Sequence, residues 1–461
     1  MKKIFLGLGA AALAAGALAS CGKTNENVSG KISDSKVFHI YVWNEEFKGF
    51  FEKYLSDEAA QFVEAAEKED ATLKPKVTHY KGKEVKWTIN PSDGGVYQQK
   101  LDVALRKNAK ASDADKVDMF LAEADYILKY SNSIYTKDVT DLGVTDFSNI
   151  YDYTKQVASD STGAVKGVSF QCCPAGVIYR RSIAKAVLGT DDPAEVQKKI
   201  ANWSKFNDVA KQMKDKGYLM TSSFAETYRA FSNNTEKAWV DDENYLQFDA
   251  QINAWMDQAI DYYSKGYTLT AGVWDDECTA EMFKTGKTFC WFGPAWYYNF
   301  CMGNAQDKEK GCFGDWALCE GPAAYYWGGT WIQCPAGGND DFLVSQVMNE
   351  FINNKELCKK LVKNEGQFSN NKLANQEVAD EYDKEGTGNA FLGGQNDTKL
   401  YLELAKNIQV KNQTIYDQYC NEGIQNAIGE LLKGALATKE EAIAQFKTKL
   451  ALNCADIKGL E

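Results

Sequence analysis

The sequence is poor in histidine, in proline and in closely spaced cysteines, and each scarcity excludes a class of protein. Its only histidines are His39 and His79 among 461 residues, so a histidine-built metal site or a Ser-His catalytic triad is not expected. Seven prolines argue against long extended linkers. The 12 cysteines include no C-x-x-C pair and are too sparse for a disulfide-stapled scaffold. No D-x-D-x-D loop indicates calcium, and no cofactor is expected.

Long uncharged apolar runs are also missing, except at the N-terminus. The run from Ile4 to Ala19 follows two lysines and is shorter than the ~20 residues of a membrane-spanning helix. A basic start followed by a short apolar region predicts an export signal over residues 1–20. The run ends in "LASC", residues 18–21, which resembles the bacterial lipobox, and Cys21 would then be the acylated first residue of the mature protein. An ordinary secretory signal that happens to contain a cysteine is the alternative.

The chain that remains after this signal is large and acidic. Residues 21–36 are polar and predict a flexible tether behind the lipidated N-terminus. The 441 residues from Cys21 onward, which are the 461 less the 20 of the signal, exceed what one core usually supports, so two lobes are expected. Without the two lysines of the signal, 50 basic and 64 acidic residues give a net charge near −14. Such acidity disfavours nucleic acid and anionic lipid as partners, so the ligand is expected to be neutral or locally recognised.

Eleven cysteines remain besides Cys21, an odd number, so at least one must be free or bridge to another chain. Several occupy small apolar positions in strand-like runs, among them Cys290, Cys319 and Cys334. Most are therefore expected to be buried thiols that pack as small hydrophobic groups.

The first part of the mature chain alternates strands with helices. Apolar, β-branched runs predict strands over 36–43, 84–89 and 116–125. Helical spacing predicts a helix that begins near residue 45 and another over 94–109. This alternation is typical of a parallel α/β sheet, in which ligands bind beyond the carboxyl ends of the strands.

Polar and aromatic residues stand at the ends of two of these strands. Trp43 and Asn44 follow the first strand, with Glu45 next to them, and Glu123 and Asp125 end the third. Asn44 is also a plausible N-cap, and acids at a helix start are common for dipole reasons alone. This shared edge of the sheet is predicted to be a pocket.

A second unit follows "DLG" at 141–143. Strands are expected over 165–170 and 176–183, and helices over 202–218 and 340–362. The tail, 424–451, predicts two further helices with a break near Thr438.

Three stretches combine glycine turns with aromatic residues. "MFKTGKTFCWFGPAW", 282–296, predicts a strand over 287–292 and a turn at Gly293-Pro294 after which Trp296 projects. "GPAAYYWGGTWIQCPAGGND", 321–340, places Gly328 and Gly329 between two tryptophans, where backbone can approach a partner closely. "VKGVSFQCCPAGVIYRRSI", 165–183, is extended and presents Tyr179.

This ordered set resembles the sugar-type extracellular solute-binding proteins of ABC importers, family 1, the class that includes the maltodextrin binders. In that family a Gly-Lys … Gly-Pro-Trp segment and a later Gly-Gly … Trp segment recur in this order. The resemblance covers nearly the whole mature chain. It is closest to lipoproteins of Gram-positive gut anaerobes, through "WGGTW" (327–331) and "FLGGQN" (391–396).

The resemblance implies an α/β fold of two lobes, a type II periplasmic-binding-protein-like clamshell in which each lobe is a mostly parallel sheet flanked by helices. The first lobe would hold residues 37–148 and 322–366, and the second 149–321 and 367–461. A neutral mono- or oligosaccharide would bind between the lobes. The closed protein, expected to be a monomer anchored through Cys21 to the extracellular face of the membrane, would dock on ABC permease subunits served by a cytoplasmic ATPase. It would not be an enzyme.

Ten residues are candidates for contact with the sugar, because aromatic faces stack on pyranose rings while acids, amides and arginine hold hydroxyl groups. Five of the eleven tryptophans lie between 291 and 331. The resemblance implies that Trp296, by its position, is the family's stacking tryptophan, whereas Trp291 is out of phase with it and is expected in the core. Trp203, Trp239 and Trp255 are expected to pack on helices. The candidates are Trp43, Asn44, Glu45, Asp125, Tyr179, Arg229, Trp274, Trp296, Trp327 and Trp331.

Two other functions remain open from the sequence. A secreted glycoside hydrolase would also stack sugars, and it needs two carboxyl groups on opposite sides of the scissile bond. Asp125 with Glu123 or Glu320 could be nominated for that role. A clamshell binder of a polyamine or peptide would suit the acidity, but the sequence shows no obvious cage of acids around the tryptophans.

Overall fold

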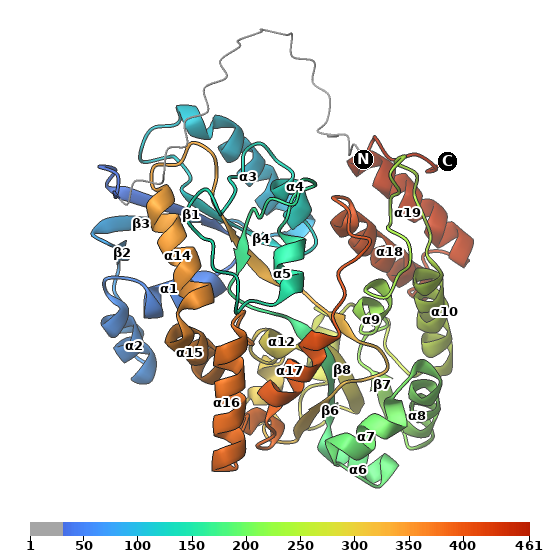
Figure 1. Cartoon of the computed structure of the whole chain (residues 1–461). Coiled ribbons are helices and arrows are strands. Elements are labelled where there is room, and N and C mark those ends of the chain that lie inside the picture. The colour runs from blue at the N-terminus through green and yellow to red at the C-terminus, as the bar shows by residue number, and fades with distance from the viewer. Residues whose placement is uncertain (1–30) are drawn as a thin grey trace.

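The computed structural model describes residues 31–461, and two separate sheets divide them into two lobes (Figure 1). The predicted signal peptide, Cys21 and most of the predicted tether lie outside the described residues. The two-lobe α/β architecture predicted from the sequence is confirmed.

The first lobe is built on a six-stranded sheet of mixed direction. Its order is β2 (His79–Tyr80), β3 (Lys83–Ile89), β1 (Val37–Val42), β4 (Met119–Glu123), β11 (Thr330–Gln333) and β5 (Val168–Ser169). The three central strands β3, β1 and β4 are parallel, as predicted, because helical crossovers join β1 to β3 and β3 to β4. The outer pairings β2–β3, β4–β11 and β11–β5 are antiparallel.

Helices cover both faces of this sheet. Phe47, Phe50 and Phe51 of α1 are buried, because they recur on one face of the helix. The predicted helix 340–362 is two helices, since the chain leaves the helical conformation at Asn354, whose side chain caps the second one. The helices of this lobe are α1 (Glu46–Tyr54), α2 (Ala59–Glu67), α3 (Val96–Lys107), α4 (Ile127–Ser131), α5 (Asp152–Val157), α14 (Asp341–Asn353) and α15 (Lys355–Glu365).

The second lobe has a sheet that is mostly antiparallel, so the prediction of a mostly parallel sheet in each lobe is wrong here. Its path is β10 (Tyr325–Tyr326), β6 (Pro174–Arg180), β8 (Thr288–Pro294) and β7 (Leu219–Thr221), and β9 (Trp316–Cys319) also pairs with β6. Only β7 and β8 are parallel. Every residue of β6 and β8 is buried, so no period-two alternation reveals the direction of these strands from sequence.

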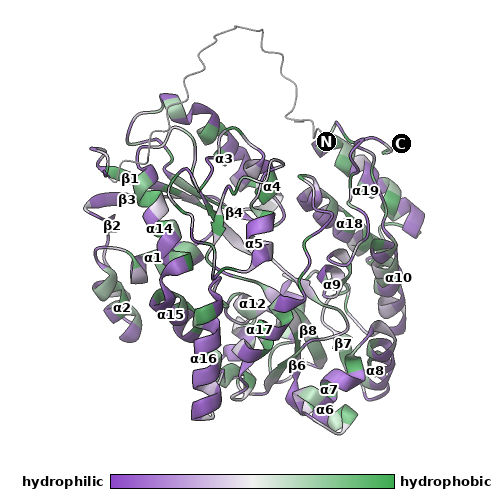
Figure 2. Cartoon of the chain, viewed as in Figure 1, coloured by the Kyte–Doolittle hydropathy of each residue, from purple (hydrophilic) through white to green (hydrophobic). Residues whose placement is uncertain are grey.

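The second lobe has two apolar cores, one against its sheet and one among helices. Figure 1 shows α18 and α19 beside α10 at the far side of the lobe, where Trp255 and Phe446 are fully buried. The predicted break near Thr438 is confirmed, because Thr438 caps α19. The helices are α6 (Arg181–Leu188), α7 (Pro193–Ile200), α8 (Trp203–Asp215), α9 (Tyr228–Ser232), α10 (Ala250–Lys265), α11 (Asp276–Ala280), α12 (Ala295–Phe300), α13 (Gly303–Gln306), α16 (Lys372–Glu385), α17 (Asp397–Lys406), α18 (Asp417–Leu432) and α19 (Lys439–Asn453). Figure 2 shows that α16 is largely hydrophilic, as expected for a helix that faces water.

The chain changes lobes at places that differ from those predicted. Strand β5 belongs to the first sheet, so the first crossing follows Ser169 rather than residue 148. Strand β10 belongs to the second sheet, so the return to the first lobe follows Tyr326 rather than residue 321. The third crossing lies near Phe368, where the chain passes from the first lobe to the second. Cys172 donates its main-chain N–H to the Phe368 carbonyl at 2.8 Å, which ties this crossing segment to the one that follows Ser169.

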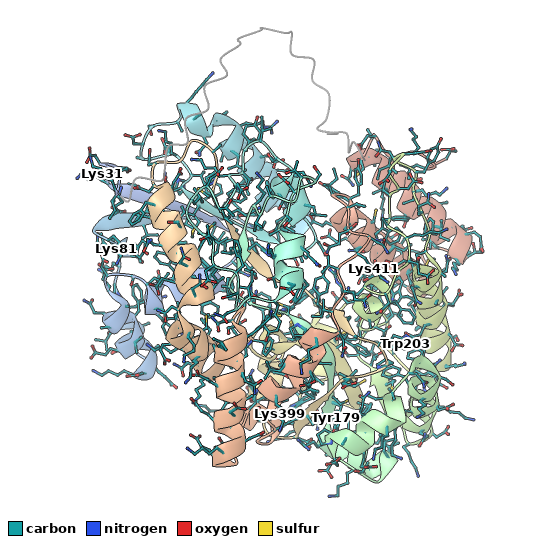
Figure 3. The ribbon with its side chains drawn as sticks, viewed as in Figure 1. Lys31, Lys81, Tyr179, Trp203, Lys399 and Lys411 are labelled. Carbon is teal, nitrogen blue, oxygen red and sulfur yellow. The ribbon has the colours of Figure 1, made fainter. Side chains whose placement is uncertain are left out.

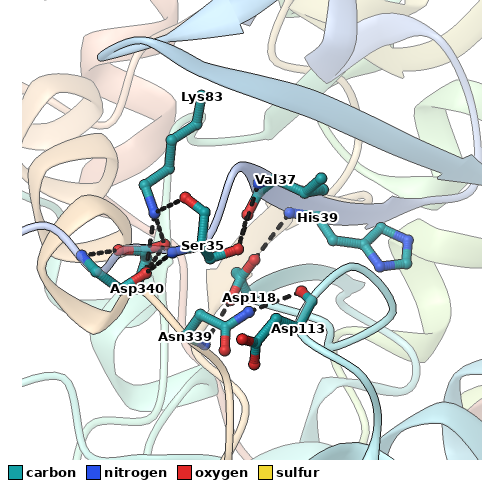
Figure 4. A network of polar contacts seen from close by, with 9 residues as sticks. Ser35, Val37, His39, Lys83, Asp113, Asp118, Asn339 and Asp340 are labelled. Carbon is teal, nitrogen blue, oxygen red and sulfur yellow. Dashed lines mark hydrogen bonds and ion pairs between the residues drawn. The ribbon is translucent and has the colours of Figure 1, made fainter.

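A buried polar network ties the start of the described chain to the first lobe (Figure 4). Ser33 donates its N–H and its hydroxyl to the two carboxylate oxygens of Asp340 at 2.8 and 2.9 Å, and the Lys83 ammonium lies 2.6 Å from the same carboxylate. The neighbouring Asp118 accepts the main-chain N–H of His39. Ser33 is therefore fixed to the fold, although the predicted tether extends to residue 36.

The cysteines are as predicted. All eleven cysteines in the described part of the chain are free thiols, and ten of them are buried. Among residues 31–461, no helix combines the length and apolar character needed to cross a membrane.

Candidate functional site

The strand ends that the sequence places at one edge of the first sheet do lie together, whereas a pocket formed by all of them stays a prediction. Strands β1 and β4 are adjacent and parallel, with Ile40 opposite Met119, so Trp43 and Asp125 emerge at the same edge. Trp43 is half-buried, and its ring centroid lies 5.7 Å from Tyr97 and 6.2 Å from Tyr126 in edge-to-face contacts. The first lobe therefore offers one indole ring beside acidic groups.

Asp125 does not stand alone at this edge, because Arg229 of the second lobe pairs with it. The two guanidinium nitrogens donate to the two carboxylate oxygens at 2.7 and 2.5 Å, a bidentate bridge between the lobes. The side chains of Arg229 and Asp125 are only 19% and 16% exposed. The sequence nominated both residues, and the structure pairs them with each other.

Two further carboxyl groups in the first lobe are partly removed from water. Burial, reinforced by the charge of Asp125, raises the pKa of Glu123 to about 8. Burial raises the pKa of Glu46 to about 7, although this carboxylate accepts a hydrogen bond from the Gln367 amide at 3.1 Å. Near neutral pH these groups can therefore donate as well as accept hydrogen bonds. Glu46 was missed because an acid at a helix start has a sufficient local explanation.

A group of aromatic rings from the second lobe and from the crossing segment that follows Tyr326, here called the aromatic wall, consists of Trp274, Trp296, Phe300 and Trp327. Ring centroids of Trp296 and Trp327 are 5.3 Å apart, and Trp274 lies 5.9 Å from Trp327 and 6.2 Å from Phe300. Trp296 and Trp327 are half-buried, whereas Trp274 and Phe300 are each 57% exposed. The wall thus runs from the interior to the solvent.

Local backbone features hold the inner rings of this wall. Strand β8 continues through Gly293 to Pro294, so the predicted turn at Gly293-Pro294 is wrong, and α12 begins directly at Ala295. A Cβ on Gly293 would lie 2.5 Å from the ring of Tyr297, so only glycine fits there. Gly328 has φ of +75°, and a Cβ added to it would lie 3.4 Å from the Trp296 ring, whose indole N–H donates to the Trp327 carbonyl at 3.1 Å. The close approach of a partner to this glycine stays a prediction.

Two nominated residues are in the core instead of the cleft. Trp331 is 1% exposed, and its indole N–H donates to the Thr154 carbonyl at 2.8 Å. Tyr179 is fully buried against Phe289, and its hydroxyl donates to the Asp191 carbonyl at the lower part of the second lobe (Figure 3). Both rings have no surface left for a ligand, so these two predictions are corrected.

Two other nominated residues have local roles. Glu45 is exposed and forms an ion pair with Lys48 at 2.7 Å. Asn44 accepts the main-chain N–H of Glu46 at 3.0 Å, so its side chain supports the start of α1 although Glu45 is the N-cap. Trp291 is fully buried, as predicted, and Trp203 stacks on Phe231 at 4.1 Å.

A polar cavity lies beside the bridge between Asp125 and Arg229. Most of its lining comes from the second lobe, including the irregular segment 407–416 between α17 and α18, here called the strap. Figure 3 shows Lys411 of the strap near the gap between the lobes. The cavity measures about 50 Å³, well below the ~300–1,000 Å³ of small-molecule pockets, so the lobes must separate to admit a ligand. The only sequence feature that points to the strap is the polar run "QVKNQT" at 409–414.

Within residues 31–461, no group of three or more histidine, cysteine, aspartate or glutamate side chains is placed to hold a metal ion. The side chains gathered at the site offer indole rings for stacking and carboxyl and amide groups for hydrogen bonding.

Solved structures with the same fold are bacterial solute receptors. The chain superposes on an extracellular solute-binding protein of family 1 with a TM-score of 0.68 and 18% identity, over 90% of this chain and 99% of the other. An ABC-transporter-associated binding protein of B. animalis subsp. lactis in complex with β-1,6-galactobiose matches with a TM-score of 0.63 and 16% identity, over 90% and 97%. An ABC substrate-binding protein of Listeria monocytogenes in complex with cycloalternan matches with a TM-score of 0.62 and 12% identity, over 92% and 100%.

Sequence comparison gives a more direct assignment. No curated protein sequence matches the chain. The family model for the bacterial extracellular solute-binding protein matches residues 77–387, which is more than half of the chain. This chain belongs to the bacterial extracellular solute-binding protein family.

Proposed function

We propose that this protein is the sugar-binding component of an ABC importer, which captures a neutral sugar between its lobes and delivers it to a membrane permease. The observation that carries the proposal is the aromatic wall, with the ring of Trp43 and the carboxyl groups of Glu46, Glu123 and Asp125 on the first lobe. Several proteins with this fold were solved with sugars, among them one with maltose and one with cycloalternan.

Sugar chemistry matches both sets of groups. A pyranose has apolar C–H faces that stack on aromatic rings, and the rings lose little conformational entropy when they bind. Its hydroxyl groups need donors and acceptors, and a partly protonated Glu46 or Glu123 supplies both. Closure of the lobes over the ring then removes these groups from water.

Isothermal titration calorimetry of the purified protein tests the proposal. The panel contains neutral mono- and oligosaccharides, including glucose, galactose, maltose and β-1,6-galactobiose, with spermidine added for a cationic ligand. Binding of at least one sugar supports the proposal. Binding of spermidine alone would replace it with the polyamine function.

A glycoside hydrolase is disfavoured by the placement of its candidate acids. Glu123 and Asp125 are two residues apart at the end of one strand, and the Asp125 N–H donates to the Glu123 carboxylate at 2.7 Å. Groups so placed stand on the same side of a ligand, whereas hydrolysis needs carboxyl groups on opposite sides of the bond. Glu320 is exposed in the second lobe. Sustained release of product from aryl glycosides would contradict the receptor function.

Lipid anchoring through Cys21 is part of the proposal and rests on the "LASC" sequence. The anchored receptor would act at the extracellular face of the membrane as a monomer. Cys21→Ser should release the protein from cells into the medium, measured by immunoblotting of the two fractions. Retention of the variant in the membrane fraction would remove the lipoprotein assignment.

A further inference from the structure

The cavity beside Arg229 and the aromatic wall are two distinct places in the cleft. No ring of Trp274, Trp296, Phe300 or Trp327 lines the cavity. The two places meet at Trp327 and Gly328: the Arg229 guanidinium lies 5.9 Å from the centroid of the Trp327 ring, and Gly328 lines the cavity, where an added Cβ would lie 3.4 Å from the Trp296 ring. A ligand that fills both places is therefore longer than one sugar ring placed on either.

The chemistry of the cavity differs from that of the wall. Six amide side chains line it, and they come from the segment between α9 and α10, the strap and α18. They are Asn233, Gln247, Gln409, Asn412, Gln413 and Asn421. Amides both donate and accept hydrogen bonds, as hydroxyl groups do, whereas the wall offers ring faces. The lining therefore suits a hydroxyl-rich group.

Several of these polar groups have no partner among the residues that the structure describes. Gln409, at the exposed rim of the cavity, makes no side-chain hydrogen bond, and the half-buried Gln413 amide donates to the Tyr326 hydroxyl while its own oxygen stays unpaired. Asn233 accepts the N–H of Tyr326 at 2.8 Å, and its side-chain NH₂ group is left over. These donors and acceptors are available to a ligand without breaking a contact of the fold.

The charged groups of the cavity are mostly engaged already, which disfavours a charged ligand. Asp125 is paired with Arg229, and Asp249 accepts main-chain N–H groups of Glu236, Lys237 and Gln251. Burial raises the pKa of Asp417 to about 7, and its carboxyl group is held by Thr414. Lys237 and Lys411 are exposed at the rim. The interior thus offers amides rather than free charges.

We infer that the cavity is a second subsite, for a neutral sugar residue linked to the one stacked on the aromatic wall, so that the ligand has at least two rings joined across Trp327. This subsite presupposes the sugar-binding function proposed for the cleft. Only Ala124 and Asp125 of the lining belong to the first lobe, so separation of the lobes would uncover the subsite on the second lobe, and closure would cover it again.

Calorimetric titration with glucose, galactose, maltose and β-1,6-galactobiose tests this inference on the full chain. A disaccharide should bind at least ~10-fold more tightly than its constituent monosaccharide, because the second ring adds hydrogen bonds, and two of them account for about a factor of 10. Equal affinities of the monosaccharide and the disaccharide would overturn the second subsite and leave the proposed function intact. Absence of binding by every sugar would overturn the proposed function and the subsite with it.

Substitution in the strap gives a second measurement. The double variant Gln409→Ala/Gln413→Ala should lose about 10-fold in disaccharide affinity and keep its monosaccharide affinity. Gln212→Ala, which removes an exposed glutamine of α8 in the same lobe, is the matched control and should change neither. Equal weakening of both sugars by the double variant would contradict the subsite. Thermal unfolding curves establish whether the double variant is folded.

Discussion

Strand β8 and helix α12 are consecutive and both rich in aromatic residues, but only α12 has exposed ones. Every residue of β8 is buried, and Trp291 within it packs edge-to-face on Trp316 at 5.0 Å. In α12, Trp296 is half-buried and Phe300 is 57% exposed. The two segments differ in their neighbours, because β8 is paired with β6 and β7, whereas α12 has one face on the cleft. Composition alone therefore does not separate a core from a binding surface.

The largest effect expected in this pair of segments is on folding. Trp291→Ala removes a fully buried indole and should lower the free energy of unfolding by about 3–5 kcal/mol. Denaturant titration followed by circular dichroism measures this. A loss below about 1 kcal/mol would show that β8 contributes no more to stability than an exposed segment does.

Trp296→Ala should affect binding instead. Loss of the half-buried ring at the centre of the aromatic wall should weaken sugar binding about 100-fold, an effect of the size seen for aromatic anchors at interface centres. Calorimetry measures the affinity, and the unfolding midpoint serves as the control. A variant that binds sugar normally but is strongly destabilised would place Trp296 with Trp291 in the core.

A buried carboxyl group that contacts β8, that of Glu226, should make the free energy of unfolding depend on pH. Glu226 is buried, its carboxylate accepts the N–H of Phe292 at 3.1 Å, and burial raises its pKa to about 8. Since the folded state holds this proton more tightly than the unfolded state, the stabilisation is full below about pH 4.5 and is lost as the pH rises through about 8.

Glu226→Gln cannot ionise and should remove this part of the pH dependence. Relative to the unmodified protein, the variant should gain on the order of 4 kcal/mol between pH 5 and pH 9, at about 1.4 kcal/mol per pH unit. Thermal denaturation at both pH values measures the difference. Parallel pH profiles for the two proteins would mean that Glu226 is not protonated in the folded state.

Phe300→Ala is expected to have the smallest effect. The ring lies at the exposed end of the wall, 6.2 Å from Trp274 and from Trp296, so its removal should weaken binding by about 3-fold at most. The loss should appear with a trisaccharide such as maltotriose and not with maltose. A loss as large as that for Trp296→Ala would mean that the solvent end of α12 is the main stacking surface.

Much of the fold was predictable because local patterns decided it. The apolar runs over β1, β3 and β4 and the helical period of α1 predict elements close to those observed. The direction of β6 and β8 was not predictable, since uniformly buried strands carry no signal of how they pair. The wrong lobe boundaries have a similar origin, because the strand predicted over 165–170 contains β5, and only its pairing with β11 assigns it to the first sheet.

The sequence nominated the tryptophans of the candidate site but not the amide side chains of its cavity. The density of tryptophan between 291 and 331 indicated a binding surface. The sequence could not show which face of its strand Trp331 occupies, because Gly328 and Gly329, both with positive φ, interrupt the alternation that begins at Trp327. Asp125 and Arg229 were each nominated, but their pairing joins residues 104 positions apart and depends on how the lobes meet. The strap reaches the cleft only through tertiary packing.

The network of Ser33, Lys83 and Asp340 has a mechanical consequence. It fastens the start of the described chain to the beginning of α14 and to β3, both parts of the first lobe. A pull on the chain ahead of Ser33 is therefore carried into the first lobe and bypasses the crossing segments. If the chain ahead of Ser33 is held, the first lobe is held with it, and any relative motion of the lobes displaces the second lobe, which carries most of the aromatic wall and the strap.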